Sequence, residues 1–580
     1  MNNASLELGG TNWAEKDGNI LGYSVGDTSG KYSPQEFTFA RGSNLSATRI
    51  DRAGLIVKGR ENVLLQSNQF DTTWGLSVSI TITSGQSGYD GTNDAWLLKR
   101  SDANARYINQ NITLGSSVYT YSVYAKPESE NWMYFWSYNG SGSVNAYFDL
   151  QNGLVGNTSG LIDATIVDAG NGYYRCSMTY NNNIAAVRIY PAVANGSISG
   201  GIANAGIYIQ DAQIEQGLAA SPYIETTTTS AQAGVLENTP RLNYTTGVAN
   251  PYLLLEPSRT NLFPNSEFFG VGTGDWISYG GQSIATNSTI SPEGFKNATK
   301  LTDTGGVYNQ VVYNPNINYV FSLFAKTDTA TSITMNFVDQ GAGYLGGSIK
   351  YTFATGATSV ILQSANGSVT ADKEDYGNGW IRVILKFTTN AAQNYNYQQI
   401  DFQGGDGWIF GTQLETGSYP TSYIPTYSVS ATRAEDNCNK TNASGEIGQT
   451  EGTIFLDFVA QTSAGQSQSH FALGSIGNEI LIYGSTAFQF YSSGGVNIGG
   501  GGFVTGQRYK IAFAYKANNY VAYVNGLQKG TDGNASVPTT SAIYLNSYVD
   551  GSEIQKKKIN QAALYKERLT NAELATLTTI

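Results

Sequence analysis

The chain has 580 residues and a formal net charge of −11, and charged residues make up only 13% of it. Its acidic balance argues against nucleic acid as a partner, since phosphates demand basic grooves, and the lack of any 18-residue apolar run argues against membrane insertion. The 67 glycines and 39 tyrosines suit tight turns and pleated strands, which favours an all-β fold over helical bundles, coiled coils or disordered tails.

The first part of the chain, residues 1–58, matches neither of the repeats described below. Its start, MNNASLELGG, has no basic segment and no apolar core of the kind that makes a secretory signal. We therefore treat 1–58 as an N-terminal region of its own.

Two copies of one module follow. YSVYAK (121–126) returns as FSLFAK (321–326), GNGYYR (170–175) as GNGWIR (377–382), and QIEQG (213–217) as QLETG (413–417). Because these landmarks recur in the same order, the sequence predicts one domain at 59–226 and a second copy at 259–427, joined by a linker at 227–258. Cys176 and Cys438 fall in different candidate domains and are predicted to be free buried thiols.

Each copy has the pattern of a β-sandwich. Tyr119, Tyr121 and Val123 alternate with polar residues at the period of two that strands show. The Asn-Gly pairs within the two GNG motifs favour hairpins with primed turns. Short extended segments without a helical stretch predict tandem β-sandwich (jelly-roll) domains.

After a linker at 428–450, residues 451–580 have a different pattern. TIFLDFVA (453–460) and YKIAFAYKA (509–517) read as alternating strands, and Lys556–Lys558 as a solvated strand edge. Thr570 and Glu573 form a capping box that predicts one short helix at the end of an otherwise all-β domain.

The sequence carries no catalytic motif. The one histidine, His470, has no nucleophile motif near it, and HExxH, GxSxG and CxxC are absent, so we predict a protein that is not an enzyme and has no metal or cofactor. Carboxylates alone can hydrolyse glycosides, and the candidates are Glu215, Glu415, Asp457 and Glu573. Glu215 and Glu415 occupy the same place in both copies, where each is expected to fix a turn or to pair with Arg175 or Arg382.

The strongest binding signal is an aromatic row in NWMYFWSYN (131–139). On a strand, one face would carry the candidate carbohydrate-binding residues Trp132, Tyr134, Trp136 and Tyr138, and the other face Met133 and Phe135. Sugar C–H groups stack on such rings, and indole and phenol groups add polar edges for hydroxyls.

The second copy shows which face is special. SITMNFVD (332–339) keeps the apolar side but replaces the aromatic side with Ser332, Thr334, Asn336 and Val338. The shared side is therefore the core, and the aromatic row belongs to the first copy. Two interpretations stay open, because a row of Trp and Tyr also suits an interface with a neighbouring subunit or domain.

The framework around the modules resembles a known family. FTFARGSNLSATRI (37–50), PRLNY (240–244), LLLEPSRTNL (253–262) and SYIPT…ATRAED (422–436) resemble bacteriophage tail-fibre and virion appendage proteins, in which carbohydrate-binding-module-like jelly rolls are strung together. YVNGLQKG (523–530) and LYKERLTNAEL (564–574) are similar to laminin-G-like, concanavalin-like sandwiches.

The resemblance implies a phage structural protein: a tail fibre, spike or head appendage that adheres to host cell-surface glycans. It implies other virion proteins as partners, a homo-oligomer (trimers are the family habit), and assembly in the host cytoplasm with release of the virion by lysis. Residues 1–58 are then the candidate for attachment to the particle. Two alternatives remain: a surface-polysaccharide depolymerase or glycosidase, and a purely architectural collar, baseplate or capsid-decorating protein without glycan binding.

Overall fold

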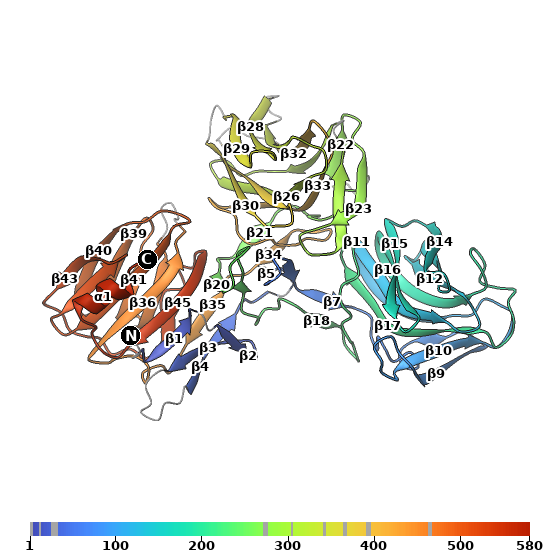
Figure 1. The fold of residues 1–580 in the computed structure, drawn as a ribbon, viewed down its shortest axis with the longest axis horizontal. Coiled ribbons are helices and arrows are strands. Elements are labelled where there is room, and N and C mark those ends of the chain that lie inside the picture. Colours follow the sequence, from blue (N-terminus) through green and yellow to red (C-terminus); the bar gives the residue numbers. More distant parts are fainter. Residues whose placement is uncertain are drawn as a thin grey trace.

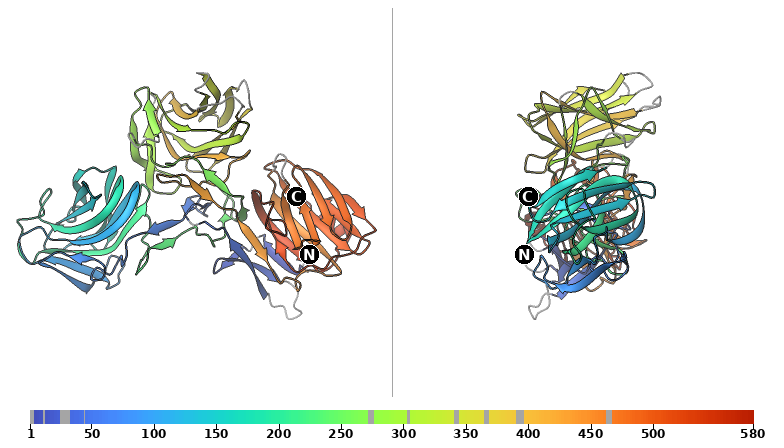
Figure 2. Two further views of the ribbon diagram at one scale, coloured as in Figure 1. Left: turned by 180° about the vertical axis from the view of Figure 1, so that it is seen from behind. Right: turned by 90° about the vertical axis from the view of Figure 1, so that its right-hand side faces the viewer.

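The chain forms three β-rich lobes around a central junction (Figure 1). In this computed structural model the described residues are 4–10, 13–24, 33–43, 45–270, 276–302, 305–339, 344–363, 368–389, 396–461 and 467–580. Two lobes are the repeated modules and the third contains both the earliest and the latest of the described segments (Figure 2). The prediction of tandem β-sandwiches with one short terminal helix is confirmed for these residues.

The first module is an antiparallel sandwich built around two long bent strands, β11 (Ile108–Pro127) and β16 (Tyr173–Ala192). Register shifts near Leu114 let β11 pass from one layer to the other, as strands do at sandwich corners. One layer adds β8 (Gly75–Leu76), β12 (Trp132–Tyr138), β13 (Ser143–Asp149) and β14 (Leu154–Ser159). The other adds β9 (Ile80–Gln86), β10 (Ala95–Arg100), β15 (Asp163–Gly170) and β17 (Gly206–Gln216).

The second module repeats this plan with shorter strands. One sheet has the order β22 (Trp276–Tyr279), β25 (Gly306–Val311), β32 (Asn396–Gln403), β27 (Ser332–Asp339), β28 (Tyr344–Thr352), β29 (Ala357–Leu362). The facing sheet has the order β23 (Ile284–Ile290), β24 (Lys296–Leu301), β33 (Gly407–Thr416), β26 (Asn318–Thr327), β31 (Ile381–Thr388), β30 (Val369–Asp375).

The third lobe is assembled from chain segments far apart in sequence. One layer contains β1 (Leu6–Gly9), β2 (Ala14–Lys16), β3 (Asn19–Ser24), β19 (Leu242–Asn243), β20 (Tyr252–Leu255), β36 (Glu451–Val459), β41 (Arg508–Lys516), β42 (Tyr520–Val524), β43 (Leu527–Asp532) and β45 (Lys557–Tyr565). The other contains β35 (Asn437–Lys440), β37 (Ser469–Ser475), β38 (Asn478–Tyr483), β39 (Ala487–Ser492), β40 (Val496–Gly502) and β44 (Ile543–Tyr544). Strand β4 (Ser33–Ala40) pairs with both β3 and β35 and so joins the two layers. The helix α1 (Asn571–Leu577) packs on the first layer.

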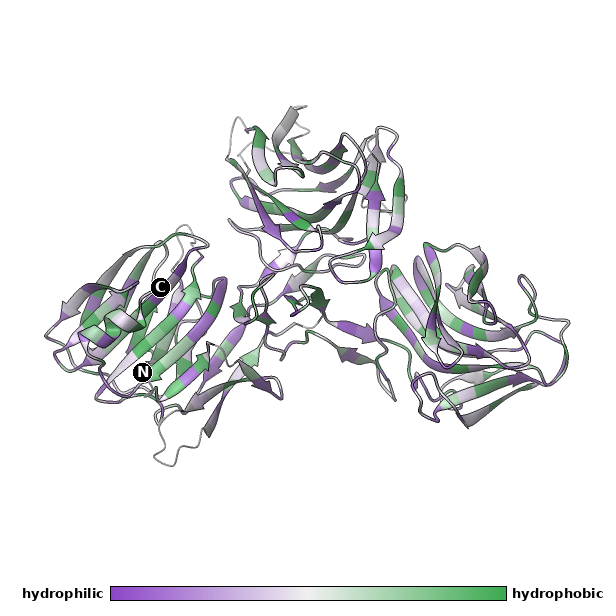
Figure 3. Ribbon diagram, viewed as in Figure 1, coloured by the Kyte–Doolittle hydropathy of each residue, from purple (hydrophilic) through white to green (hydrophobic). Residues whose placement is uncertain are grey.

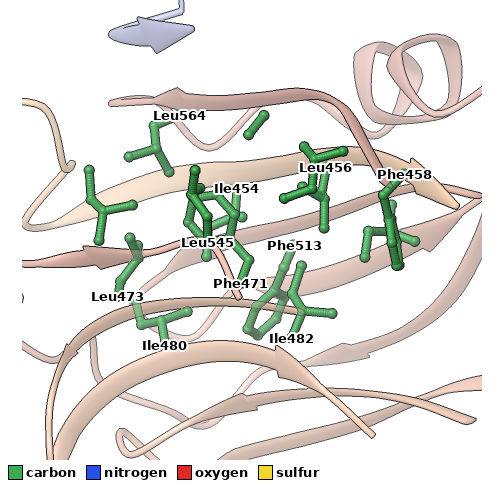
Figure 4. Close-up of a cluster of buried hydrophobic side chains, with 14 of the residues drawn as sticks. Ile454, Leu456, Phe458, Phe471, Leu473, Ile480, Ile482, Phe513, Leu545 and Leu564 are labelled. Carbon is green, nitrogen blue, oxygen red and sulfur yellow. The ribbon is translucent and has the colours of Figure 1, made fainter. Parts of the chain in front are cut away.

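The structure revises the boundary drawn at residue 58. Strand β1 pairs with β45, with Leu6 opposite Leu564, and β20 from the expected linker pairs with the other end of β45. Leu6 and Leu8 are buried in the same core as Ile454, Leu473 and the other residues of Figure 4. The N-terminal strands cover an edge of β45 that residues 451–580 alone would leave unpaired, which is the physical reason for the rearrangement.

The expected linkers are ordered too. Small antiparallel pairs hold the junction together: β5 (Thr48–Ile50) with β6 (Ile56–Lys58), β7 (Arg60–Asn62) with β18 (Ala231–Ala233), and β21 (Arg259–Asn261) with β34 (Ala431–Arg433). Beside them lies a group of fully buried charges, named here the junction cluster: Arg41, Arg241, Glu256, Arg433 and Asp436.

Several local predictions are confirmed. Asn171 and Asn378 have φ values of 52°, each followed by a glycine with positive φ, as primed hairpin turns require. The capping box of Thr570 and Glu573 is present. Polar and apolar residues alternate along many strands (Figure 3). Both cysteines are unpaired and buried, each in a different hydrophobic core.

The lysine run differs from its prediction. Lys557 is completely buried, and its ammonium group donates to Ser469 O and Asn546 Oδ1, both at 2.5 Å. The run does not lie on a solvated edge because β45 is covered on one side by β36 and on the other by β1 and β20.

Candidate functional site

The aromatic row lies on strand β12, in the layer of the first module that is farther from the central junction (Figure 1). Met133 and Phe135 belong to the core of this lobe. Trp132, Trp136 and Tyr138 are half-buried on the opposite face, and Tyr134 is 9% exposed between them. The alternation along β12 therefore gives the row the orientation that the sequence pattern predicts.

Neighbouring strands widen the row into a surface, named here the aromatic face: Tyr107, Trp132, Tyr134, Trp136, Tyr138, Tyr147, Arg188 and Tyr190. Strand pairing sets Tyr134 between Tyr147 of β13 and Tyr190 of β16. The ring centroids lie 4.4 Å and 5.2 Å apart for these two contacts. Trp136 and Tyr138 stack at 5.3 Å with an interplanar angle of 7°.

Arg188 holds part of this surface together. Its guanidinium carbon lies 4.2 Å from the ring centroid of Trp136 and 4.1 Å from that of Tyr107, and Nη1 donates to the Tyr190 hydroxyl at 3.2 Å. Such cation–π contacts fix ring orientation as well as adding attraction. Among the described residues Arg188 has no carboxylate partner, so it brings a positive charge to the face.

The edge of the face is polar. Gly156 approaches Trp132 so closely that a Cβ there would lie 2.6 Å from the indole Cζ3, and Asn195 packs at the same point. Asn195 Oδ1 accepts from the backbone N–H of Asn157 at 2.7 Å. Amide side chains beside a half-buried indole provide hydrogen-bonding groups next to a stacking platform.

Burial controls the ionisation of the phenols on this face. Desolvation raises the pKa of Tyr134 and of Tyr190 above the ordinary value for tyrosine. Both hydroxyls therefore remain neutral at physiological pH. The face is suited to stacking and hydrogen bonding rather than to acid–base chemistry.

The corresponding face of the second module lacks the aromatic residues of the first on β32 as well as on β27. By register, Thr334 replaces Tyr134, Asp401 replaces Tyr190 and Gln399 replaces Arg188. Tyrosines instead occur on β32, which is next to β27, and on the two strands beyond it: the ring centroid of Tyr308 (β25) lies 4.9 Å from that of Tyr397 (β32) and 6.0 Å from that of Tyr279 (β22).

The carboxylates considered for catalysis are held by structural partners. Glu215 accepts from the amide and hydroxyl of Ser221 at 2.7 and 2.6 Å, and Glu415 does the same with Thr421. Both thus fix a turn, as predicted, but their arginine neighbours are Arg60 and Arg259 rather than Arg175 and Arg382.

The remaining candidates also have structural contacts. Asp457 accepts from Arg508 Nε at 2.8 Å, and Glu573 accepts from the Thr570 backbone at 2.8 Å. His470 is fully buried among Phe458, Phe488 and Phe503, and burial lowers its pKa well below the usual value.

The described residues contain neither a metal-binding cluster nor a membrane-spanning helix. No group of three or more His, Cys, Asp or Glu side chains there is placed to hold a metal ion. In the same part of the chain no helix has the length and apolar character needed to cross a bilayer.

The residues that sequence reasoning missed come from other strands. Tyr147, Arg188 and Tyr190 are brought to β12 by strand pairing that a single segment does not reveal, and Tyr107, just before β11, joins them through its contact with Arg188. The alternating VRIYPA (187–192) held a signal, since Arg188 and Tyr190 share a face two residues apart.

The fold and the site together define a protein of tandem antiparallel β-sandwiches, one of which carries an aromatic sheet face. No protein-family model matches the chain. Over 116 residues, 19% of its length, the chain is 33% identical to the tRNA nuclease WapA of Bacillus subtilis (strain 168) and to the tRNA(Glu)-specific nuclease WapA of Bacillus subtilis subsp. natto (strain BEST195). The chain spans only 5% of the length of these curated relatives.

Among solved structures, the chain is similar to the CBM22-1–CBM22-2 tandem domain of Paenibacillus barcinonensis Xyn10C. The identity is 9%, the match covers 65% of this chain and all of the other, and the TM-score is 0.20. For Trypanosoma rangeli sialidase the identity is 8%, the coverage 98% of each chain, and the TM-score 0.22. With TM-scores this low, the description of the fold rests on the strand pairing itself.

Proposed function

We propose that this chain is a non-enzymatic adhesive protein that binds surface glycans through the aromatic face of its first module. The observation that carries the proposal is a set of three half-buried rings, Trp132, Trp136 and Tyr138, on one sheet face. Their ring and packing partners all come from residues 105–198, within the same lobe. These rings keep accessible surface for a sugar to stack on.

The contact between one aromatic face and a glycan would be weak on its own. Low charge and abundant hydroxyl and amide side chains suit a ligand that offers hydroxyls rather than phosphates. Firm adhesion would then come from avidity, since several copies held together raise the effective concentration of each site. This favours an oligomer, and the resemblance to virion appendages makes a trimeric tail fibre, spike or head appendage the form we propose.

In this proposal the host cell-surface glycan and other virion proteins are the partners, and the virion is the location. The sequence suggests that residues 1–58 alone could attach the protein to the particle. In the structure, strands β1 to β4 of this region belong to the third lobe. Attachment through residues 1–58 would therefore mean attachment of the lobe that contains both β1 and β45.

The test is binding of the purified chain to host cells and to their extracted surface polysaccharide. Each ring contributes about 1 kcal/mol or more, so Trp132→Ala/Trp136→Ala should weaken binding by at least about tenfold. Trp408→Ala, a half-buried tryptophan on the second module, is the matched control and should bind as the wild type does. Thermal melting checks that each variant is folded.

Two results would refute the proposal in different ways. Release of reducing ends from the polysaccharide by the wild type would make the protein a depolymerase or glycosidase. Absence of binding by a folded wild-type oligomer would leave an architectural part whose aromatic face is covered by a neighbouring subunit.

A further inference from the structure

A cavity lies at the central junction, away from the aromatic face. It has a volume of about 430 Å³ and is bounded by β5, by the hairpin β19–β20, by β30 and by the start of β45. Thr245, Thr246 and Asp375 are exposed members of its wall, so the cavity opens to solvent there. Its size is within the range of small-molecule sites.

Two cations in the wall lack an anionic partner. The side chain of Arg49 makes no hydrogen bond or ion pair with the residues that the structure describes, and its Nε is buried without an acceptor. The ammonium group of Lys558 makes no ion pair or side-chain hydrogen bond with the described residues; the ring of Tyr252 lies 5.3 Å from it, and it acts on Glu374 only through space. An arginine nitrogen left without an acceptor in a buried position is costly, and a bound oxyanion would satisfy it.

The motif SATR occurs twice, at 46–49 and at 430–433, and its two arginines have different surroundings. Arg433, the counterpart of Arg49, is fully buried and pairs with Glu256 at 3.1 Å, and its guanidinium also donates to Pro257 O. The same motif thus gives one arginine inside the junction cluster and one that faces a cavity without a carboxylate of its own.

The other charges of the wall are already satisfied. Arg382 donates to Thr421 O at 2.7 Å and Lys556 to Pro420 O at 2.7 Å. Glu256 accepts from Ser422 and from two arginines, and Asp375 accepts from the Gly377 amide at 2.8 Å. A ligand would therefore meet Arg49 and Lys558 as the unpaired charges.

The pKa of Glu374 reflects the positive charges around the cavity. Burial would raise the pKa of this carboxyl, yet the positive charges of Lys556, Arg382 and Lys558 lower it below the ordinary value for glutamate. The carboxylates in the wall nonetheless limit how much negative charge a ligand can carry. A singly charged group fits this balance better than a phosphate ester or sulfate cluster.

We propose that this cavity binds a carboxylate-bearing sugar, such as a hexuronic acid unit, with the carboxylate on Arg49 and Lys558. The rest of the wall suits a sugar ring: Tyr244, Tyr252 and Tyr376 supply aromatic surface, and the exposed Thr245 and Thr246 supply hydroxyl groups. A bare inorganic anion would leave these groups unused. Guanidinium groups bind carboxylates in a planar, bidentate manner, which also orients the ring.

The test is a ligand-observed NMR titration of the full chain with D-glucuronate, D-glucose and sulfate at low salt. Glucuronate should bind saturably and at least tenfold more tightly than glucose. Arg49→Gln and Lys558→Gln should each weaken glucuronate binding, Arg49→Gln by at least tenfold. Trp132→Ala/Trp136→Ala is the control that separates this site from the aromatic face and should leave glucuronate binding unchanged.

Each other outcome overturns the proposal. Equal affinity for glucose and glucuronate, or undiminished binding by Arg49→Gln, would remove the role of the cation. Sulfate that displaces glucuronate at equal or lower concentration would show an inorganic anion site instead. Because Arg49 has no protein partner, Arg49→Gln should melt at the wild-type temperature, so lost binding will not reflect unfolding.

Discussion

Replacing one carboxylate of the junction cluster should loosen the centre of the molecule. Asp436 accepts from Arg41 Nη1 at 3.1 Å, from Arg241 Nη2, and from the backbone N–H of Glu256 at 2.9 Å. Both arginines and Asp436 have fully buried side chains. Asp436→Asn keeps the shape but leaves three buried arginines facing one carboxylate.

The expected cost follows from this imbalance. Breaking a buried ion pair by neutralising one partner typically destabilises a protein by about 3–5 kcal/mol, because the remaining charge is desolvated and uncompensated. For lobes of this size we expect the calorimetric melting temperature of the affected transition to fall by roughly 6–20 °C. Differential scanning calorimetry at neutral pH measures this directly.

A surface pair provides the control. Asp372 pairs with Lys386, and their side chains are 54% and 27% exposed. Asp372→Asn should therefore change stability by no more than about 1 kcal/mol. If Asp436→Asn melts within the range of Asp372→Asn, the junction cluster does not hold the lobes together and the reasoning fails.

Three further predictions concern the third lobe. Leu8→Ala should destabilise that lobe by about 2–5 kcal/mol in denaturant unfolding, whereas Leu527→Ala, at an exposed position of β43 in the same lobe, should have almost no effect; equal effects would mean that β1 is not part of the core. Thr570→Ala should lower the stability of the α1 helix by about 0.5–2 kcal/mol, because the helix cap is lost, and this should be measured as faster hydrogen exchange in α1. Burial lowers the pKa of Lys557 to about 7, so above that pH the unfolded chain binds more protons than the folded chain does. The free energy of unfolding should therefore rise from pH 7 towards pH 10. Lys557→Met should flatten this slope, and an unchanged slope would contradict the assignment to Lys557.

Local patterns in the sequence were sufficient for much of the fold. The two copies, the primed turns at Asn171 and Asn378, and the cap at Thr570 depend on neighbouring residues, and each is present. The orientation of the β12 row also follows from the period of two along a strand.

Features that depend on distant pairing could not be predicted in this way. Leu6 and Leu8 form too short an alternating segment to identify a partner, and that partner, β45, lies more than 500 residues away. The lysine run was predicted to be solvated because nothing local shows that β20 and β36 pair with it on either side. Likewise Arg188 and Tyr147 join the aromatic face only through the register of three strands.

The pairing of β1 with β45 sets an order for assembly. During synthesis the two modules can fold as soon as each emerges, since their strands pair within residues 60–233 and 259–433. Strands β1 to β4 must wait for residues 437–565, and until then the side chains of Leu6, Leu8 and Phe37 have no core to enter. Strands β1 to β4 are thus buried only after β45 has been made, and a chain truncated before β45 would have two folded modules and an open, aggregation-prone strand edge.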